Sequence, residues 1–447
     1  MTLSIIFFLL YIAVVVIIGI ISSRKETEDG FMIAERNVGG LQLAASMSAG
    51  FFDGAILSVY IGYVYQYGLS ASWIFVGIAL GFLLIRKYST RIKQKADELK
   101  VYSMPEYFYR LLGKRNGLMF SLFLVTQFFF FLIIGLIASG KILSGIFPIQ
   151  YALAVLIGGG IILTYLLLAG FKAVVKTDFF QFLVMILMTL IVGIFLFGKT
   201  HFDSSNLNLS AIGFGNIIGF LILGGLGIMV APDIWQRMFA ARDVKTLKRG
   251  LWYSGLALVL LGLVISVLGL ATKQFFPDIL PEDALVTGFK NLLPSALEAF
   301  GMVLLYAVAL SSSDTVTFVI SSIFTRDLQN YSTSYNQKSM RKLTRFFMVT
   351  LVFVAMLIAI FYQNILHLGL ALASLNLALF PVVFGTLYWT FKKPAVFWSL
   401  ICAYISVVIL FFLGSLTPET AIISLPVALF SLLIFQKIFK SEPVLST

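Results

Sequence analysis

Uninterrupted apolar runs occupy most of this sequence. They lie approximately at residues 3–21, 41–67, 70–88, 118–145, 149–168, 174–198, 211–231, 250–271, 294–325, 343–362, 366–389, 395–413 and 419–437. A helix of about 20 apolar residues crosses a bilayer, whereas barrel strands would alternate in polarity. Only 12% of the residues are charged, against about 25% in a soluble domain. We therefore predict an all-α polytopic membrane protein with about thirteen transmembrane helices.

The loops between these runs are too short for a soluble catalytic domain. Cys402, the single cysteine, lies in an apolar run and excludes an internal disulfide. The two histidines, His201 and His367, fall near predicted outer loops, so a metal or nucleophilic catalytic site has few residues to be built from. We expect neither an enzyme nor an organic cofactor, and nothing indicates an obligate protein partner.

The distribution of lysine and arginine predicts the orientation in the membrane. With the N-terminus outside and the C-terminus in the cytoplasm, roughly 28 of the 32 basic residues fall in inward loops. Lys141, Lys199, Lys273 and Lys290 then lie outside. The net charge of +12 therefore indicates contact with anionic lipid in the plasma membrane rather than with nucleic acid. The run 3–21 lacks a charged leader and a cleavage site, so we expect a retained helix.

Two runs are interrupted at corresponding positions of two halves of the chain. The run 41–67 is rich in small polar residues and contains Asp53, and the glycine-rich run 211–231 leads directly into Pro232. Such a pair is typical of secondary transporters built from inverted repeats, in which unwound backbone frees carbonyl oxygens to hold a cation. Alternatively, the small residues only allow helices to pack closely.

This pattern divides a single membrane transport domain into four parts. Residues 1–40 form an extra helix and loop, 41–198 the first five-helix repeat, 211–389 the second, inverted repeat, and 390–447 two C-terminal helices.

The run 294–325 contains a polar cluster from Ala309 to Thr315, with four hydroxyls and the carboxylate of Asp314. A charge near the bilayer centre costs at least about 2.5–3.5 kcal/mol, so the cluster indicates a cation site. Hydroxyls alone are weaker evidence, because serine and threonine also bond back to their own helix.

Five motifs follow one another along the chain. They are Ala44–Gly50, Ser103–Tyr107, Gly170–Val175 with Asp178, Gln236-Arg237 with Ala240-Ala241, and Ser311–Asp327. In this order the chain resembles the sodium:solute symporter family over nearly its whole length. That family includes the sodium/proline, sodium/galactose and sodium/sialic acid symporters. The resemblance implies a LeuT-type fold of two inverted five-helix repeats and Na⁺-coupled uptake of a small organic solute by alternating access.

The resemblance also implies a sodium site. Its ligands would be the backbone carbonyls of Ala44, Met47 and Val308 and the hydroxyls of Ser311 and Ser312. Five hard oxygens, several of them from interrupted helices, suit a small hard cation.

A second sodium site is implied at Asp178, with Ser311, Asp314 and Thr315 supplying further oxygens. The alternative is that the two aspartates pair with a nearby lysine such as Lys176 and have a structural role. The number of coupling ions, one or two, therefore remains open.

For the solute, Ser46, Ser48 and Phe51 match positions that contact it in relatives. Asp53 either neutralises an ammonium group of the solute, or belongs to an outer gate, or bonds to a neighbouring helix. Which of these roles it has stays open at this point.

Gln127 and Trp235 are further solute candidates, and each has helix packing as its alternative role. The run 118–145 contains no arginine, which argues against an acidic sugar as the solute. Two other functions stay open, a proton-coupled permease with Asp178 as the titrating group and a sensory transporter-like protein. The solute itself is not identified by the sequence.

Overall fold

The computed structural model describes residues 5–10, 12–13, 36, 38–51, 54–101, 103–168, 183, 186–187, 189–198, 207–295, 297–303, 305–306, 309, 313, 316–317, 319–321, 323 and 337–439. Within these residues every regular element is a helix, and a single isolated bridge joins Val38 to Ala241. The expected all-α class is confirmed for this part of the chain.

The α-helices are α3 (Gly40–Phe51), α4 (Gly54–Tyr67), α5 (Trp73–Leu99), α6 (Met104–Leu112), α7 (Lys114–Ile146), α8 (Tyr151–Leu168), α11 (Phe214–Val230), α12 (Pro232–Ala240), α13 (Val244–Phe275), α14 (Ala284–Leu292), α16 (Gln337–Phe361), α17 (Ile365–Gly385), α18 (Lys393–Phe412) and α19 (Ser424–Ile438). Short 3-10 helices are η2 (Gly68–Ser72), η3 (Pro281–Asp283) and η4 (Thr420–Ile423).

Among the described residues, six helical segments are long and apolar enough to cross a membrane, and the bent pair α11 and α12 makes a seventh. Two shorter apolar helices cover Tyr151–Thr164 and Arg345–Phe361. The expected spans 3–21, 174–198 and 294–325 fall partly on residues outside the described set. A multi-pass helical protein is therefore confirmed, whereas the count of about thirteen and the repeat boundaries stay predictions.

α5 extends well beyond the apolar run that predicted it. Its last turns carry the ion pairs Lys93–Asp97, with Nζ 2.8 Å from Oδ1, and Lys95–Glu98, with Nζ 2.9 Å from Oε2. Charged residues of this kind are good helix formers, and pairs three or four apart stabilise a helix end. Apolarity predicted where the membrane segment ends, and the helix continues past that point to Leu99.

The motif that begins at Ser103 is the start of helix α6. The Ser103 side chain accepts a hydrogen bond from the Glu106 amide, Pro105 lies in the first turn, and Gly113 ends the helix with φ of 83°. A serine followed three residues later by glutamate is the sequence pattern of a capping box, and proline is well suited to a first helical turn. The residue types of this motif are therefore explained locally, by the start of helix α6.

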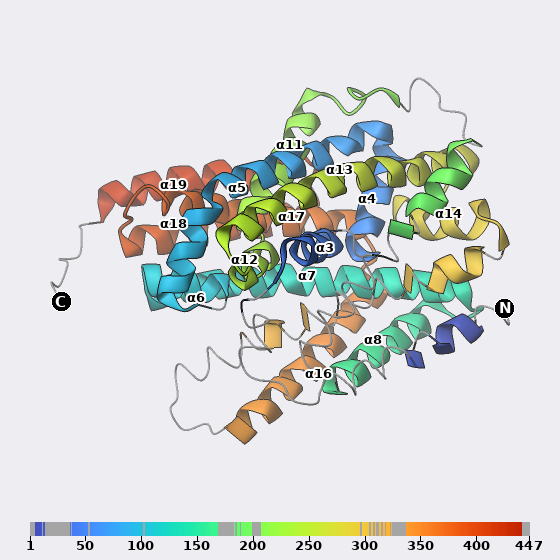
Figure 1. The fold of residues 1–447 in the computed structure, drawn as a ribbon, viewed down its shortest axis with the longest axis horizontal. Coiled ribbons are helices and arrows are strands. Elements are labelled where there is room, and N and C mark those ends of the chain that lie inside the picture. Colours follow the sequence, from blue (N-terminus) through green and yellow to red (C-terminus); the bar gives the residue numbers. More distant parts are fainter. Residues whose placement is uncertain are drawn as a thin grey trace.

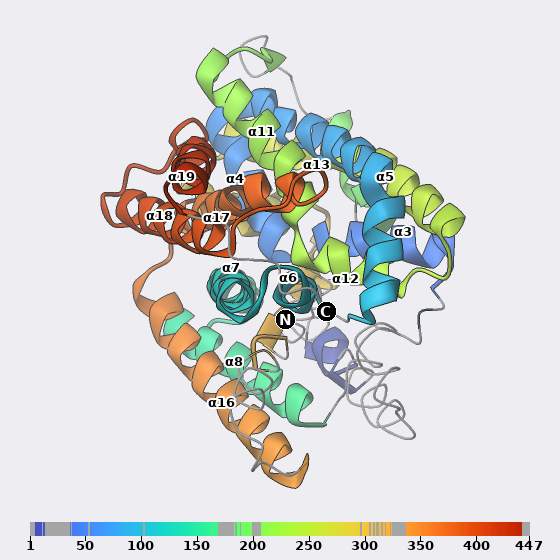
Figure 2. The same ribbon diagram turned by 90° about the vertical axis from the view of Figure 1, so that its left-hand side faces the viewer.

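The helices form two groups joined along their length. α5 packs on α11 and α13, and α13 packs on α3. α7 packs on α8 and α16 in the second group, and α17 contacts both α7 and α11. Figure 1 shows α3 and α12 between α13 and α7, and Figure 2 shows α12 between α6 and α5, with α3 toward the edge of the molecule.

Glycines allow α5 and α11 to touch backbone to backbone. A Cβ at Gly77 would lie 2.6 Å from the Leu221 carbonyl oxygen, and one at Gly224 would overlap the Ile74 carbonyl oxygen. Only a missing side chain permits this approach. Gly224 therefore serves helix packing, which is the alternative that the sequence had left open.

The break after α11 lies where the sequence predicted it. Ala231 is extended, with φ −69° and ψ 113°, and Pro232 begins α12 at an angle of 42° to α11. Proline lacks an N–H group and disfavours helical geometry in the residue before it. The other interrupted helix divides into α3 and α4, and residues 52–53 between them lie outside the described set.

Candidate transport site

An ion pair on α12 faces helix α3. Arg237 Nη1 lies 3.2 Å from Asp233 Oδ2, and Arg237 Nε donates to Ser46 Oγ on α3 at 2.9 Å. A Cβ at Gly50 would lie 3.2 Å from Arg237 Nη2 and 3.4 Å from Asp233 Oδ2. α3 and α12, which are halves of two different interrupted helices, are thus joined through a charged pair that lies against Gly50.

Two of the predicted sodium ligands lie on α3, and both are buried. Ala44 is 6% exposed and Met47 is fully buried. Ser254 on α13 lies with its Oγ 3.3 Å from the Ala44 carbonyl oxygen and 2.9 Å from the Gly250 carbonyl oxygen. No pattern in the sequence singles out Ser254, because a lone serine in an apolar helix is common.

The remaining cation candidates lie outside the described residues: Val308, Ser311, Ser312, Asp178, Asp314 and Thr315. Their geometry stays a prediction. In the same segment Ser313 Oγ donates to the Ala309 carbonyl at 3.1 Å, and Thr317 Oγ1 donates to the Ser313 carbonyl at 2.6 Å. At these two positions the hydroxyls bond back to their own helix.

The solute candidates on α3 have different surroundings. Ser46 is already bonded to Arg237. Ser48 is fully buried, and its hydroxyl has no hydrogen-bond partner in the part of the chain that the structure describes. Phe51 ends α3, and its side chain, like the whole of Asp53, is outside the described set.

Gln127 on α7 is 2% exposed, and neither amide atom has a hydrogen-bond partner among the described residues. Residues seven apart share one face of a helix, so Gln127 lies on the face of Phe120 and Lys141. Phe120 stacks on Phe108 of α6 at 4.0 Å between ring centroids, and Lys141 Nζ lies 2.6 Å from Asp283 Oδ1 of η3. The unpaired amide thus lies between an aromatic contact, about 10 Å away along α7, and an ion pair about 21 Å away.

Trp235 packs against the break between α11 and α12. Its ring is fully buried, and Nε1 donates at 2.8 Å to the Met229 carbonyl, one of those left without a helical partner where α11 ends. The ring also packs 5.2 Å from Tyr107 and 5.6 Å from Phe108, both of α6. These contacts favour the packing role over direct contact with the solute.

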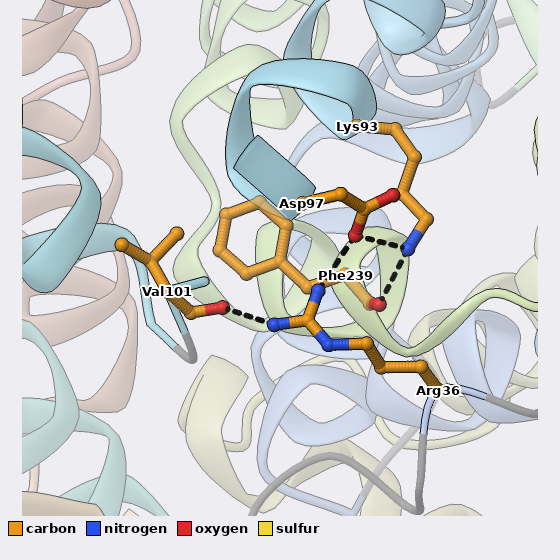
Figure 3. Close-up of polar contacts among 5 residues, drawn as sticks. All are labelled: Arg36, Lys93, Asp97, Val101 and Phe239. Carbon is orange, nitrogen blue, oxygen red and sulfur yellow. Dashed lines mark hydrogen bonds and ion pairs between the residues drawn. The ribbon is translucent and has the colours of Figure 1, made fainter. Parts of the chain in front are cut away.

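A charged network lies at the far end of α12 (Figure 3). Arg36 Nη1 and Lys93 Nζ lie 2.6 Å and 2.8 Å from Asp97 Oδ1. Lys93 also donates to the Phe239 carbonyl, and Arg36 donates to the Val101 carbonyl, both at 3.0 Å. Basic residues expected to face the cytoplasm thus connect α5, α12 and the segment before α3.

The family model for the sodium:solute symporter family matches residues 31–402. The chain belongs to this family. It is 26% identical over 413 residues to the osmoregulated proline transporter OpuE of Bacillus subtilis (strain 168), with 85% of this chain and 82% of OpuE covered. It is also 26% identical over 412 residues to the sodium/proline symporter of Staphylococcus aureus (strain Newman), with coverage of 85% and 80%.

Solved structures show the same fold. A Na⁺-coupled sialic acid symporter, in a substrate-bound outward-open state, superposes with a TM-score of 0.81 at 16% identity and covers 100% of this chain and 99% of its own. The nucleobase-cation-symport-1 family transporter Mhp1 gives a TM-score of 0.61 at 15% identity, with coverage of 93% and 96%.

The resemblance found in the sequence motifs is therefore confirmed. This symporter is a multi-pass membrane transporter that couples Na⁺ to the movement of a small solute.

Proposed function

We propose that this symporter takes up a small organic solute into the cytoplasm with Na⁺ by alternating access, and that L-proline is the first solute to test. The names of the curated relatives, which are proline transporters, support this choice. The main support for the proposal is the match of residues 31–402 to the family model, because this range includes both interrupted helices.

The proposed sodium site uses the carbonyls of Ala44, Met47 and Val308 and the hydroxyls of Ser311 and Ser312. The burial of Ala44 and Met47 on α3, next to the end of a half-helix, supports it. A second ion at Asp178, Asp314 and Thr315 is part of the proposal as an option.

The proposed solute site lies at the helix breaks, with Ser48, Phe51 and Gln127 as contacts and Asp53 at the outer side. A buried amide without a partner costs about 1–3 kcal/mol, and a polar solute would remove that cost. The buried polar groups of Ser48 and Gln127, which have no hydrogen-bond partner among the residues that the structure describes, therefore support a polar occupant.

The same proposal includes the boundaries of the two repeats and the orientation of the chain in the membrane. The repeats comprise 41–198 and 211–389, the N-terminus lies outside, and the C-terminus lies in the cytoplasm. The break at Ala231 and the basic network around Lys93 support these assignments.

One Na⁺ is energetically sufficient for such uptake. Its movement down 100 mV contributes about 2.3 kcal/mol, and a tenfold gradient adds about 1.4 kcal/mol. Full coupling then sustains roughly 500-fold accumulation of a solute without net charge.

The test is thermal unfolding of the purified protein in NaCl against KCl at equal ionic strength. Ligand binding to the folded state raises its stability by RT ln(1 + [Na⁺]/Kd). We expect a Na⁺-specific increase in the unfolding midpoint that is lost in Ser311→Ala/Ser312→Ala. Ser406→Ala, which removes a hydroxyl that bonds to the Ala403 carbonyl on α18, is the matched control and should keep the increase.

L-proline added in NaCl should then raise the midpoint further, and reconstituted vesicles should take it up only with an inward Na⁺ gradient. Stabilisation by NaCl and KCl alike, with uptake that follows pH instead, would reject Na⁺ coupling and favour a proton-coupled permease.

A further inference from the structure

The exposed side of α5 changes from apolar to basic along a single stripe. Its large exposed apolar residues are Val76, Leu80 and Leu83. Lys87 and Arg91, the next two residues at the same helical spacing, are exposed as well. Residues three or four apart share one face of a helix, so these five side chains form a stripe about 23 Å long, which we call the α5 stripe. In a membrane protein, its apolar part lies along lipid acyl chains and its basic part reaches the head groups.

The two basic residues of the α5 stripe lack an acidic neighbour. No ion pair joins Lys87 or Arg91 to a carboxylate in the part of the chain that the structure describes. The acidic residues of α5, Asp97 and Glu98, lie further along the helix and are paired with other basic residues. Two positive charges without a counter-charge from the protein favour an anion from the surroundings.

Two tyrosines, Tyr88 of α5 and Tyr388 just after α17, hold these cations in place. Lys87 Nζ lies 5.6 Å from the centroid of the Tyr88 ring, and Arg91 Cζ lies 5.9 Å from that of Tyr388. Both distances suit cation–π contacts. Arg91 Nη1 also donates to the Leu387 carbonyl, and Tyr388 donates at 2.7 Å to the Tyr88 hydroxyl. Groups that are held before a ligand arrives lose less freedom when it binds.

Exposed aromatic residues indicate the depth of these cations in the membrane. Four such residues lie near the start of α13 and just after α17: Trp252, Tyr253, Tyr388 and Trp389. Arg86 Nε donates at 3.1 Å to the Lys248 carbonyl, which places the start of α13 beside Lys87. Tryptophan and tyrosine are enriched where a membrane meets water. The basic part of the α5 stripe therefore lies at the level of the lipid phosphates, in the cytoplasmic leaflet if the orientation is the proposed one.

We propose that the α5 stripe binds an anionic phospholipid. Its phosphate accepts hydrogen bonds from Lys87 and Arg91, and an acyl chain lies along Leu83, Leu80 and Val76. A zwitterionic lipid binds more weakly, because it carries a positive group of its own beside the phosphate. A free phosphate ion has no acyl chain, and a soluble macromolecule does not reach the apolar part of the stripe. The site is independent of the proposed function, since lipid binding needs neither a coupling ion nor a solute.

A purely structural role is the competing explanation for Arg91, because it bonds to a neighbouring backbone carbonyl. Lys87→Gln avoids this difficulty, since Lys87 has no hydrogen bond or ion pair among the described residues. The double variant Lys87→Gln/Arg91→Gln removes both cations. Lys95→Gln/Lys290→Gln is the matched control, because it removes two exposed basic residues that lie away from the α5 stripe.

The experiment uses the detergent-purified full chain in KCl, without Na⁺ or solute. Dioleoyl phosphatidylglycerol, dioleoyl phosphatidylcholine and inorganic phosphate are titrated separately. The unfolding midpoint measures stabilisation by each of them, and native mass spectrometry measures the affinity for each lipid.

We expect phosphatidylglycerol to bind the unmodified protein and the control variant at least tenfold more tightly than phosphatidylcholine, and to raise their midpoints more. Inorganic phosphate should leave the midpoints unchanged. A basic residue near an anionic lipid surface is worth roughly fivefold in binding. Lys87→Gln should therefore weaken phosphatidylglycerol binding about fivefold and the double variant at least tenfold, with phosphatidylcholine binding unchanged in both.

Four results would overturn the inference. Equal binding of the two lipids to the unmodified protein would show that lipid charge is not recognised. A double variant that keeps the preference would place recognition elsewhere, and an equal loss in the control variant would show that only total charge matters. Stabilisation by inorganic phosphate as large as that by phosphatidylglycerol would show a site for small anions rather than for a lipid.

Discussion

Substituting Gly77 by alanine should separate α5 from α11 and destabilise the protein. The new Cβ would lie 2.6 Å from the Leu221 carbonyl oxygen and 3.0 Å from both Leu221 Cα and the Phe220 carbonyl oxygen. Ordinary contact begins at 3.4 Å, so the two backbones must move apart by about 0.8 Å. A gap of that size forfeits about a quarter to a half of each van der Waals contact along the crossing, and such overpacking costs about 1–3 kcal/mol.

The unfolding midpoint of the purified protein measures this cost. At about 2.1 cal per mol per K for each residue, the unfolding entropy of 447 residues is about 0.9 kcal per mol per K, so the midpoint should fall by about 1–3 °C. Gly227→Ala on α11 is the control, since its Cβ meets nothing within 4 Å, and its midpoint should stay equal or rise. Equal midpoints for the two variants would refute the argument from close helix contact.

Two further predictions concern Gln127 and Asp243. Gln127→Met removes a buried amide that has no hydrogen-bond partner in the described part of the chain, so the solute-free protein should gain about 1–3 kcal/mol of stability. L-proline binding, measured by calorimetry, should weaken at least tenfold. A loss of stability would show that the amide has a partner within the protein. The Thr246 amide, which donates to Asp243 at the start of α13, lowers the pKa of that carboxyl to about 2, below the ordinary value of about 3.9. The pKa is lower in the folded protein than in the unfolded chain, so the ionised Asp243 stabilises the fold at pH values above the unfolded pKa, and this stabilisation is lost as the pH falls through the folded pKa. Asp243→Ala should therefore lower the unfolding midpoint at pH 7, and its difference from the unmodified protein should shrink between about pH 4 and pH 2. A difference that stays constant over this range would contradict the capping role.

The sequence predicted the membrane class, the family and one of the two helix breaks closely. Proline at 232 follows a glycine-rich apolar run, and the backbone breaks at Ala231 for local steric reasons that need no tertiary information. Apolar runs were less informative about helix ends, because polar residues such as those near Lys93 prolong α5 beyond the membrane segment.

The sequence also left two readings of the small residues that only the structure separates. Gly77 and Gly224 meet the backbone of the facing helix, whereas Gly50 meets the side chains of an ion pair. All three are glycines in apolar helices, and their roles differ because of what lies opposite them.

Periodicity and composition by themselves determined that this chain crosses a membrane many times, where α11 must end, and which residue types are available to bind a cation. These are local properties, fixed by the cost of burying charge and by the geometry of proline. Only the tertiary structure decided that Trp235 satisfies the Met229 carbonyl, that Gln127 has no hydrogen-bond partner among the described residues, and that Asp233 lies beside Gly50. Such relations join residues far apart in the chain or depend on which atoms meet, and no pattern along the sequence carries that information.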